Sequence, residues 1–329
     1  MDSQALHGLS FRKPNESEDF ERIAKVVNES WAADGIDAVR TADELEKNFA
    51  NPIDFNPKED CLIVQAGTEI IGFSEVTSQE KLDGEFRYWH YPHLLPGFRF
   101  GNLRRTMITW NEERIRTIAA ARTNARRQFI EVYANTKERN DWKELIVETG
   151  YVPTWYLFEM VRSNLEKIPD YPFPDGVETR PVRNEDLRKI WNAAKDALKD
   201  QRDSTKEKWN DEGFEKSTSS PGHDPRLWQI AWHGDQVVGG VLNYIDTDEN
   251  ESLGRKWGHT EEIFVVRPWR KKGVARALIA RSLRVIRDHG MEKATLDVDT
   301  ENPSGALGLY KALGYEVERQ FTFYHKELR

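Results

Sequence analysis

The sequence contains a single cysteine, Cys61, among 329 residues. One thiol excludes an internal disulfide framework and a cysteine-based metal cluster, so we expect a reducing, cytoplasmic environment and no metal site. No segment approaches the ~20 consecutive apolar residues of a membrane span, and the first ten residues lack the basic and apolar segments of a secretory signal. The sequence therefore predicts no membrane partner and no export.

A surplus of positive charge is also absent. The chain has 56 Asp and Glu residues against 48 Lys and Arg, which gives a formal net charge of −8. This balance argues against a nucleic-acid partner, because such surfaces concentrate Lys and Arg. Apolar residues make up 38% and charged residues 32% of the chain, as is typical of a globular protein, and the length suffices for two domains.

The same order of sequence signals appears twice. Each copy begins with a short strand and an amphipathic helix, continues with two apolar runs that turn like a β-hairpin, and later has a glycine–aromatic pair. The matching segments are 9–31 and 177–198, 61–76 and 227–245, and Gly150-Tyr151 and Gly314-Tyr315. A repeat of this length indicates a duplicated α+β domain and not a solenoid.

Three prolines in 163–177 mark the boundary between the copies, which we place near Pro174. The predicted parts are a first domain at 1–165, a linker at 166–176 and a second domain at 177–329. Within the second copy, the polar stretch 199–225 is expected to be a partly disordered surface loop, with a lid over a pocket as the alternative.

Positive charge gathers at one junction, "RPWRKKGVA" at 267–275, directly after the apolar run "IFVV". Pro268 should end the strand, and helical spacing of apolar residues begins after Gly273. The first N–H groups of a helix lack partners and carry positive partial charge, so small residues and cations there favour a bound pyrophosphate. A solvated basic turn is the alternative.

Residues 259–315 resemble the Gcn5-related N-acetyltransferase (GNAT) superfamily. Its motif R/Q-x-x-G-x-G/A appears at 270–275, and its later pattern is matched by Asn302, Leu309, Tyr310, Gly314 and Tyr315. The resemblance implies an α+β fold of two tandem GNAT-like domains, each a mixed, mostly antiparallel twisted sheet flanked by helices. The spacing from Pro268 to Arg270 is one residue shorter than the commonest spacing in the family. This difference affects the bulge that the family has at the end of this strand more than the phosphate turn itself. The tandem organisation also resembles the mycothiol synthase group.

The resemblance implies acetyl-CoA as the cofactor. The main chain at the strand end would pair with the pantetheine arm, the turn would cradle the pyrophosphate, and an asparagine would contact the cofactor. The implied cofactor-binding residues are Phe264, Val265, Val266, Arg270, Lys271, Lys272, Gly273, Val274, Ala275, Arg276 and Asn302.

The resemblance also implies that Tyr310 protonates the departing thiolate. For the base that accepts the amine's proton, Glu261 and Glu262 are the candidates; strand alternation sets them on opposite faces and slightly favours Glu262, and His259 is a third option. The oxyanion needs a donor, for which a main-chain N–H near Val265 or Val266 is suited.

The first copy lacks this chemistry. Arg99-Phe100-Gly101-Asn102-Leu103 does not form the phosphate motif, and Ile146 stands where the second copy has Tyr310. We expect a degenerate domain, which could still hold a cofactor because Arg99 and Gly101 remain.

These features predict an acyl-CoA-dependent N-acyltransferase that moves acetyl from acetyl-CoA to the primary amine of a small molecule, with its active site in the second copy. Two alternatives stay open. One is a non-catalytic acyl-CoA-binding or sensor protein in which Tyr310 is structural, and the other is an enzyme that acetylates protein amines. An intact tyrosine beside an intact phosphate turn favours an enzyme over a sensor.

Overall fold

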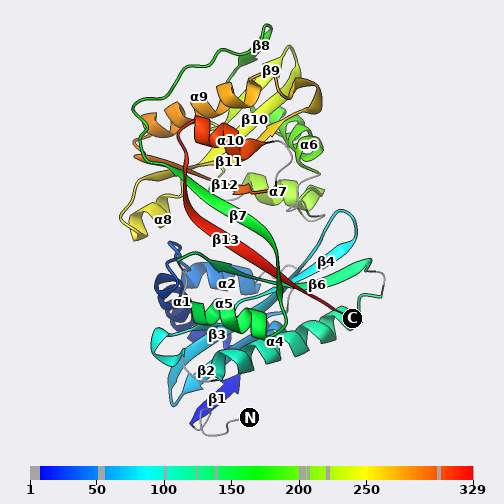
Figure 1. Cartoon of the computed structure of the whole chain (residues 1–329), viewed down its shortest axis with the longest axis vertical. Coiled ribbons are helices and arrows are strands. Elements are labelled where there is room, and N and C mark those ends of the chain that lie inside the picture. The colour runs from blue at the N-terminus through cyan, green and yellow to red at the C-terminus, as the bar shows by residue number, and fades with distance from the viewer. Residues whose placement is uncertain are drawn as a thin grey trace. The chain divides into compact units, whose positions relative to one another are not determined.

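The computed structural model of the chain falls into two compact units, unit 1 and unit 2 (Figure 1). Unit 1 consists of Met1–Trp155 with Phe321–Arg329, and unit 2 of Tyr156–Gln320. The structure describes residues 8–50, 56–99, 102–123, 125–137, 140–199, 205, 208–219, 223–301 and 305–328. Both units combine a mixed sheet with flanking helices, which confirms the predicted α+β class.

Unit 1 is built on strands in the order β1, β2, β3, β4, β6, β13, with β5 paired to β3. Their bounds are β1 (Leu9–Arg12), β2 (Cys61–Ala66), β3 (Glu69–Glu80), β4 (Glu85–His90), β5 (His93–Leu94), β6 (Arg127–Asn135) and β13 (Glu316–Glu327). Neighbours are antiparallel except β4 and β6, which are parallel. The predicted first hairpin is formed by β2 and β3, which turn at Gly67.

The helices of unit 1 cover this sheet. They are α1 (Glu16–Ala33), α2 (Ala42–Ala50), α3 (Pro57–Asp60), the short 3-10 helix η1 (Pro96–Phe98), α4 (Leu103–Ala120) and α5 (Asn140–Glu148). The apolar face predicted for α1 is buried: Phe20, Ile23, Val26 and Val27 pack with β2 and β3 in one core cluster. Helical spacing of apolar residues thus placed this face correctly.

Unit 2 has its strands in the order β7, β12, β11, β10, β9, β8. Their bounds are β7 (Val152–Arg162), β8 (Val177–Thr179), β9 (Gln229–His233), β10 (Gln236–Tyr244), β11 (Trp257–Val265) and β12 (Lys293–Asp299). The helices are η2 (Asn184–Asp186), α6 (Leu187–Leu198), α7 (Asp211–Ser219), α8 (Thr247–Ser252), η3 (Arg267–Trp269), α9 (Val274–Asp288) and α10 (Ala306–Ala312). None of the helices described in either unit is both long and apolar enough to cross a membrane.

The core of unit 2 centres on α9. Leu278, Ile279, Leu283 and Ile286 recur at helical spacing and are each 0% exposed. They pack against apolar residues of the strands and α10 in one cluster. Because this burial fixes α9 along its whole length, the start of the helix is held firmly beside the end of β11.

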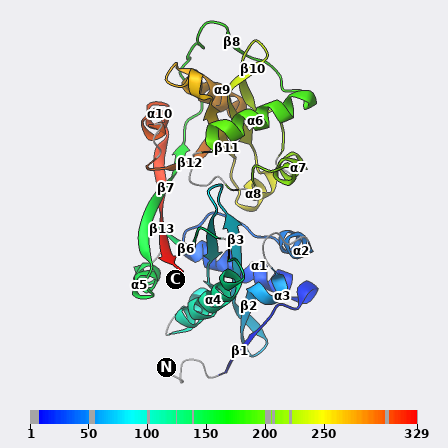
Figure 2. The same cartoon turned by 90° about the vertical axis from the view of Figure 1, so that its right-hand side faces the viewer.

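The strands β7 and β13 each pass from one unit to the other (Figures 1 and 2). In unit 1, Phe321–Glu327 of β13 pairs with β6, and in unit 2, Leu157–Arg162 of β7 pairs with β12. The division therefore differs from the predicted one, in which the second copy runs unbroken from 177 to 329. Contacts place the predicted linker, 166–176, in unit 2 and the end of the chain in unit 1.

Candidate active site

Unit 2 contains a gap between two parallel strands. The paired positions of β11 and β12 are Trp257 with Lys293, Gly258 with Ala294, and His259 with Thr295. Both strands continue past the last pair, to Val265 and Asp299, and no further pair joins these described residues. Beyond His259, the edge of β11 that faces β12 is therefore open and can pair with an extended ligand.

β11 also carries a β-bulge on the side of β10. The antiparallel register shifts between Gly240 and Leu242, where β11 has one extra residue. Glu262 lies at this point with a left-handed φ of +45°, which is uncommon for a residue with a side chain and occurs in bulges. Strict alternation is interrupted at a bulge, so alternation alone does not determine which face Glu262 occupies. The bulge is present despite the short spacing from Pro268.

One amide after the bulge faces the gap. The N–H of Val266 donates to the carbonyl oxygen of Val238 in β10 at 3.0 Å, so it points toward β10. Because successive residues of a strand direct their amides to opposite neighbours, the N–H of Val265 faces the open edge. Of the two main-chain donors predicted for the oxyanion, Val265 is the better placed.

Glu262 forms an ion pair with the polar stretch 199–225. Lys208 Nζ lies 2.6 Å from Glu262 Oε1, and both side chains are 29% exposed. The neighbouring Trp209 is buried, and Lys195 of α6 donates to its carbonyl oxygen at 2.8 Å. The described part of the stretch is thus docked on unit 2: it includes α7, and the buried Trp209 anchors it.

Tyr310 lies on α10 in the core of unit 2 and is 7% exposed. Burial raises the pKa of its phenol, and the negative charge of Glu261 raises it further. The phenol therefore stays protonated at neutral pH, which suits a proton donor. The ring also packs edge-on against Tyr315, with centroids 6.2 Å apart, so its environment is compatible with a packing role as well.

His259 is held as a neutral imidazole. Its ring stacks on Tyr244 at 4.4 Å between centroids, and its Nδ1 lies 2.8 Å from Thr295 Oγ1. Burial, aided by the charge of Arg255, lowers the pKa of His259 to about 4. A group with that pKa is a weak base at neutral pH, which makes His259 less suited than a carboxylate side chain in this gap to take the proton of an amine.

The turn between β11 and α9 leaves space for an anion. Lys271 and Gly273 have left-handed φ values of +60° and +88°. A Cβ added to Gly273 would meet no atom within 4 Å, so the space beside the start of α9 is open. The residues present fit a pyrophosphate: an open cradle, the positive end of a 15-residue helix that begins at Val274, and the cations Lys271, Lys272 and Arg276.

Arg270 uses its guanidinium within the protein. Nε donates to Val265 O at 3.1 Å, and Nη2 donates to Ala197 O at 3.0 Å. These two bonds tie the turn to the end of β11 and to the last residues of α6. The sequence predicts Arg270 as a cofactor ligand, whereas its contacts in the structure hold the turn in place.

Unit 1 contains an arginine with the same two bonds. Arg99 donates through Nε to Leu94 O at 3.2 Å and through Nη2 to Ser30 O at 2.9 Å. Leu94 precedes Arg99 by five residues, as Val265 precedes Arg270, and Ser30 belongs to the last turns of the unit's first long helix. The duplication has therefore kept this anchoring arginine in both copies.

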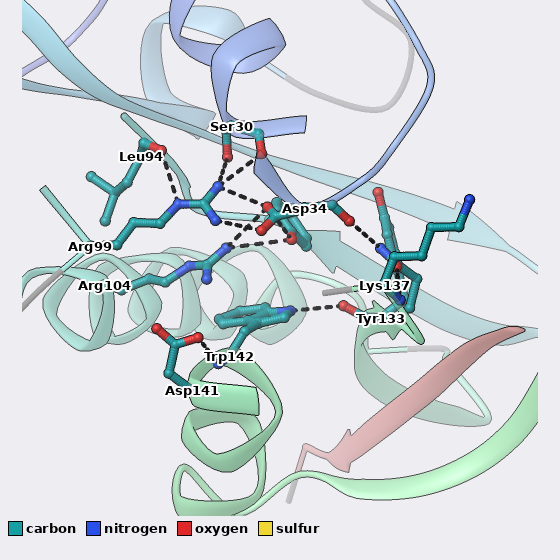
Figure 3. A network of polar contacts seen from close by, with 11 residues as sticks. Ser30, Asp34, Leu94, Arg99, Arg104, Tyr133, Lys137, Asp141 and Trp142 are labelled. Carbon is teal, nitrogen blue, oxygen red and sulfur yellow. Dashed lines mark hydrogen bonds and ion pairs between the residues drawn. The ribbon is translucent and has the colours of Figure 1, made fainter. Parts of the chain in front are cut away.

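The charge of Arg99 is neutralised inside unit 1 (Figure 3). Its guanidinium donates two hydrogen bonds to the carboxylate of Asp34, which is 0% exposed. Nη1 donates to Oδ1, and Nη2 donates to Oδ2 at 2.8 Å. Arg104 Nη2 lies 3.8 Å from the same carboxylate, and Tyr91 donates its hydroxyl to it at 3.2 Å. Arg99 is thus committed within the fold, which weakens the case for a cofactor in the first copy. Gly101, the other ground for it, lies outside the described residues.

Asp34→Asn is expected to lower the free energy of unfolding by about 3–5 kcal/mol, because two guanidinium groups would lose the buried charge that compensates them. Both arginine side chains are 7% exposed, so water cannot replace the carboxylate. Urea denaturation measures the change. The control is Glu29→Gln, whose carboxylate is 48% exposed and 3.8 Å from Lys25, with an expected change below about 0.5 kcal/mol. Equal changes in the two variants would contradict the prediction.

The predicted site residues of the second copy largely meet at one place. The end of β11, the turn and the start of α9 together hold Phe264, Val265, Val266, Arg270, Lys271, Lys272, Gly273, Val274, Ala275 and Arg276. The side chains of Phe264 and Val274 are buried, so they can serve a ligand through the main chain. Asn302 lies outside the described residues. Across the described chain, no group of three His, Cys, Asp or Glu side chains could hold a metal ion.

Lys208 and Trp209 were not among the site residues predicted from the sequence. The signal that could have found them is the tryptophan itself, because a large aromatic residue within a polar stretch is more often an anchor than a surface residue.

In unit 2 the sheet thus opens beside a basic glycine turn at the start of a helix. Residues 186–315 match the family model described as "Acetyltransferase (GNAT) family". The match covers the segment in which the sequence motifs predicted a GNAT domain.

Two curated relatives are acetyltransferases by name. The chain is 28% identical over 186 residues to "Mycothiol acetyltransferase" of Segniliparus rotundus, a match that covers 55% of this chain and 67% of the relative. It is 29% identical over 101 residues to "N-alpha-acetyltransferase MAK3" of Arabidopsis thaliana, covering 30% of this chain and 50% of the relative. The match thus spans half the length of the second relative.

Solved structures show the same fold over nearly the whole chain. A GCN5-related N-acetyltransferase from Sphaerobacter thermophilus has a TM-score of 0.75 at 24% identity and covers 98% of this chain and 96% of that one. A tandem GNAT protein from the clavulanic acid biosynthesis pathway has a TM-score of 0.65 at 13% identity, with coverage of 97% and 98%. The predicted tandem GNAT organisation is therefore confirmed at the level of the fold.

Proposed function

We propose that the protein is an acetyl-CoA-dependent N-acetyltransferase that acts on the primary amine of a small molecule, with its active site in unit 2. The observation that carries the proposal is the opening of β11 from β12 directly before the Gly273 turn. Acetyl-CoA supplies, when bound, an acyl group activated as a thioester. The names of both curated relatives support acetyl as the group transferred.

Three parts of unit 2 would hold acetyl-CoA. The open edge of β11 offers main-chain groups to an amide-containing arm. The first N–H groups of α9, with Lys271 and Lys272, would bind the pyrophosphate. Arg270 keeps the turn that carries these lysines in place.

The remaining residues would move protons and stabilise charge. Glu261 and Glu262 are the carboxylates beside the gap that can accept the amine's proton. The N–H of Val265 faces the same gap and can stabilise negative charge on the carbonyl oxygen. Tyr310, which is held protonated, can donate to the leaving thiolate.

The test is Tyr310→Phe, which keeps the ring and removes the hydroxyl. If Tyr310 donates the proton, turnover with acetyl-CoA and a panel of amines should fall on the order of 10²-fold while affinity for coenzyme A is kept. Release of thiol measures the rate, and calorimetry measures the affinity. The fall should shrink with a donor whose thiol is a better leaving group.

Tyr315→Phe is the matched control. Tyr315 is also buried, and its hydroxyl lies 2.9 Å from Thr260 Oγ1, so its loss should cost about 1 kcal/mol of stability and leave turnover largely unchanged. Wild-type turnover in Tyr310→Phe would refute the proton-donor role. Binding of coenzyme A without turnover of any amine by the wild type would favour a sensor over an enzyme.

A further inference from the structure

One lysine of unit 2 already lies where an acceptor amine is expected. Lys208 Nζ is 2.6 Å from Glu262 Oε1, and Glu262 is at the bulge of β11 beside the open gap. An acceptor that enters the gap as an ammonium ion would meet the same carboxylate. Lys208 therefore has both the chemistry and the position of a primary-amine acceptor.

The segment that carries Lys208 is held in this position from two sides. Trp209 is 3% exposed and packs in a core cluster that also contains Phe264 of β11. The ring of Trp209 lies 4.9 Å from that of Trp191 on α6, and Lys195 donates to the main chain at Trp209. The approach of Lys208 to Glu262 is thus set by a buried anchor at the next residue.

We propose that Lys208 is a modification site, which the protein acetylates on Nζ within the same chain. The inference rests on the proposed function. In this step the Lys208 ammonium first loses one proton through the Glu262 carboxylate to solvent. The neutral Nζ then bonds to the thioester carbonyl carbon as the carbon–sulfur bond breaks, and the nitrogen gives its second proton to Glu262. The thiolate takes the proton of Tyr310, which regains one from solvent as Glu262 releases its proton there. The products are N-acetyl-Lys208 and free coenzyme A.

Intramolecular transfer is favoured by proximity, because an amine held beside the reacting centre needs no encounter step. The product is a neutral amide, so acetylation would also dissolve the ion pair with Glu262. That carboxylate would then be available to a second ammonium group. Self-acetylation would in this way change the charge of the acceptor side of the gap.

The experiment incubates the full-length chain with isotopically labelled acetyl-CoA and follows label on individual lysines by peptide mass spectrometry. Lys216 of α7 is the internal reference, because it belongs to the same stretch, is exposed and reports uncatalysed acetylation. Label at Lys208 should appear more than ~10-fold faster than at Lys216, with a rate constant independent of protein concentration. Lys208→Arg should abolish label at this position and leave the rate at Lys216 unchanged.

Tyr310→Phe separates catalysis from passive reactivity. It should slow acetylation of Lys208 on the order of 10²-fold and leave Lys216 unaffected. Equal rates at the two lysines, or no effect of Tyr310→Phe on Lys208, would overturn the inference. If the same preparation turns over added amines while Lys208 stays unmodified, the inference alone fails. If it neither turns over amines nor labels Lys208, the proposed function fails with it.

Discussion

Gly273→Val should abolish measurable binding of coenzyme A while the protein stays folded. At a φ of +88°, valine is strained by roughly 1–2 kcal/mol, which a domain of this size tolerates. Its Cβ would meet no protein atom within 4 Å, so the branched side chain would project into the space proposed for the pyrophosphate. We expect the affinity to fall more than ~10²-fold, since the phosphate loses both its space and its close approach to the backbone. Calorimetry measures the affinity, and thermal unfolding measures the strain.

The control for this variant lies just beyond the other end of the same helix. Gly290 has a φ of +82°, and a Cβ there would also meet nothing within 4 Å. Gly290→Val should therefore show a similar loss of stability and unchanged affinity for coenzyme A. The difference between the two valines isolates the ligand from backbone strain. Unchanged affinity in Gly273→Val would show that this turn does not hold the pyrophosphate.

Ending the chain after Gln320 should unfold unit 1, although the missing residues are the last nine of the sequence. Phe321–Glu327 pairs with β6 along seven positions, and Phe323 stacks on Trp155 with ring centroids 3.7 Å apart. Phe323→Ala alone should cost about 3–5 kcal/mol, because a buried aromatic ring is lost. The truncation also removes the pairing partner of a whole strand, so its cost should exceed the 5–15 kcal/mol by which a domain is usually stable.

Buried charge adds to the cost of this truncation. Lys326 Nζ lies 2.8 Å from Glu112, and His325 contacts Glu131, a carboxylate that is 0% exposed. Circular dichroism and urea denaturation would detect the loss, and a chain ending at Leu328 is the matched control that keeps all these contacts. Supplying residues 316–329 as a separate peptide should restore part of the structure. A truncated chain with wild-type cooperativity would contradict the prediction.

Local patterns predicted those parts of the fold that local interactions determine. Helical spacing located α9, and the alternating apolar runs located both hairpins, because these periods follow from the geometry of a single element. The same holds for the turn at Gly273, where the glycine that follows two lysines has a left-handed backbone. Tyr310 was found through a motif, and its burial in the core followed only from the structure.

The rest depends on contacts between residues distant in sequence. The bulge at Glu262 arises from the register of β11 against β10, and no residue type in β11 predicts it. Lys208 contacts Glu262 because the neighbouring Trp209 is buried in the core of unit 2. The polar composition of this stretch does not predict that burial. The pairing of β13 with β6 was not predicted, because the two strands lie far apart in the sequence.

The return of β13 to unit 1 determines the order in which the parts of the chain can fold. His325 and Glu131 are 194 residues apart in sequence, so their contact requires all of unit 2 to be synthesised first. A chain that leaves the ribosome from its N-terminus therefore holds the sheet of unit 1 without its last strand, with β6 as an exposed edge. Such long-range pairing also makes folding slow, because the entropy of closing a long loop must be overcome before the contact forms. A gene split between the two copies would consequently yield two halves that each lack a strand. Unit 1 would lose β13 and unit 2 would lose β7, so both units require a single continuous polypeptide.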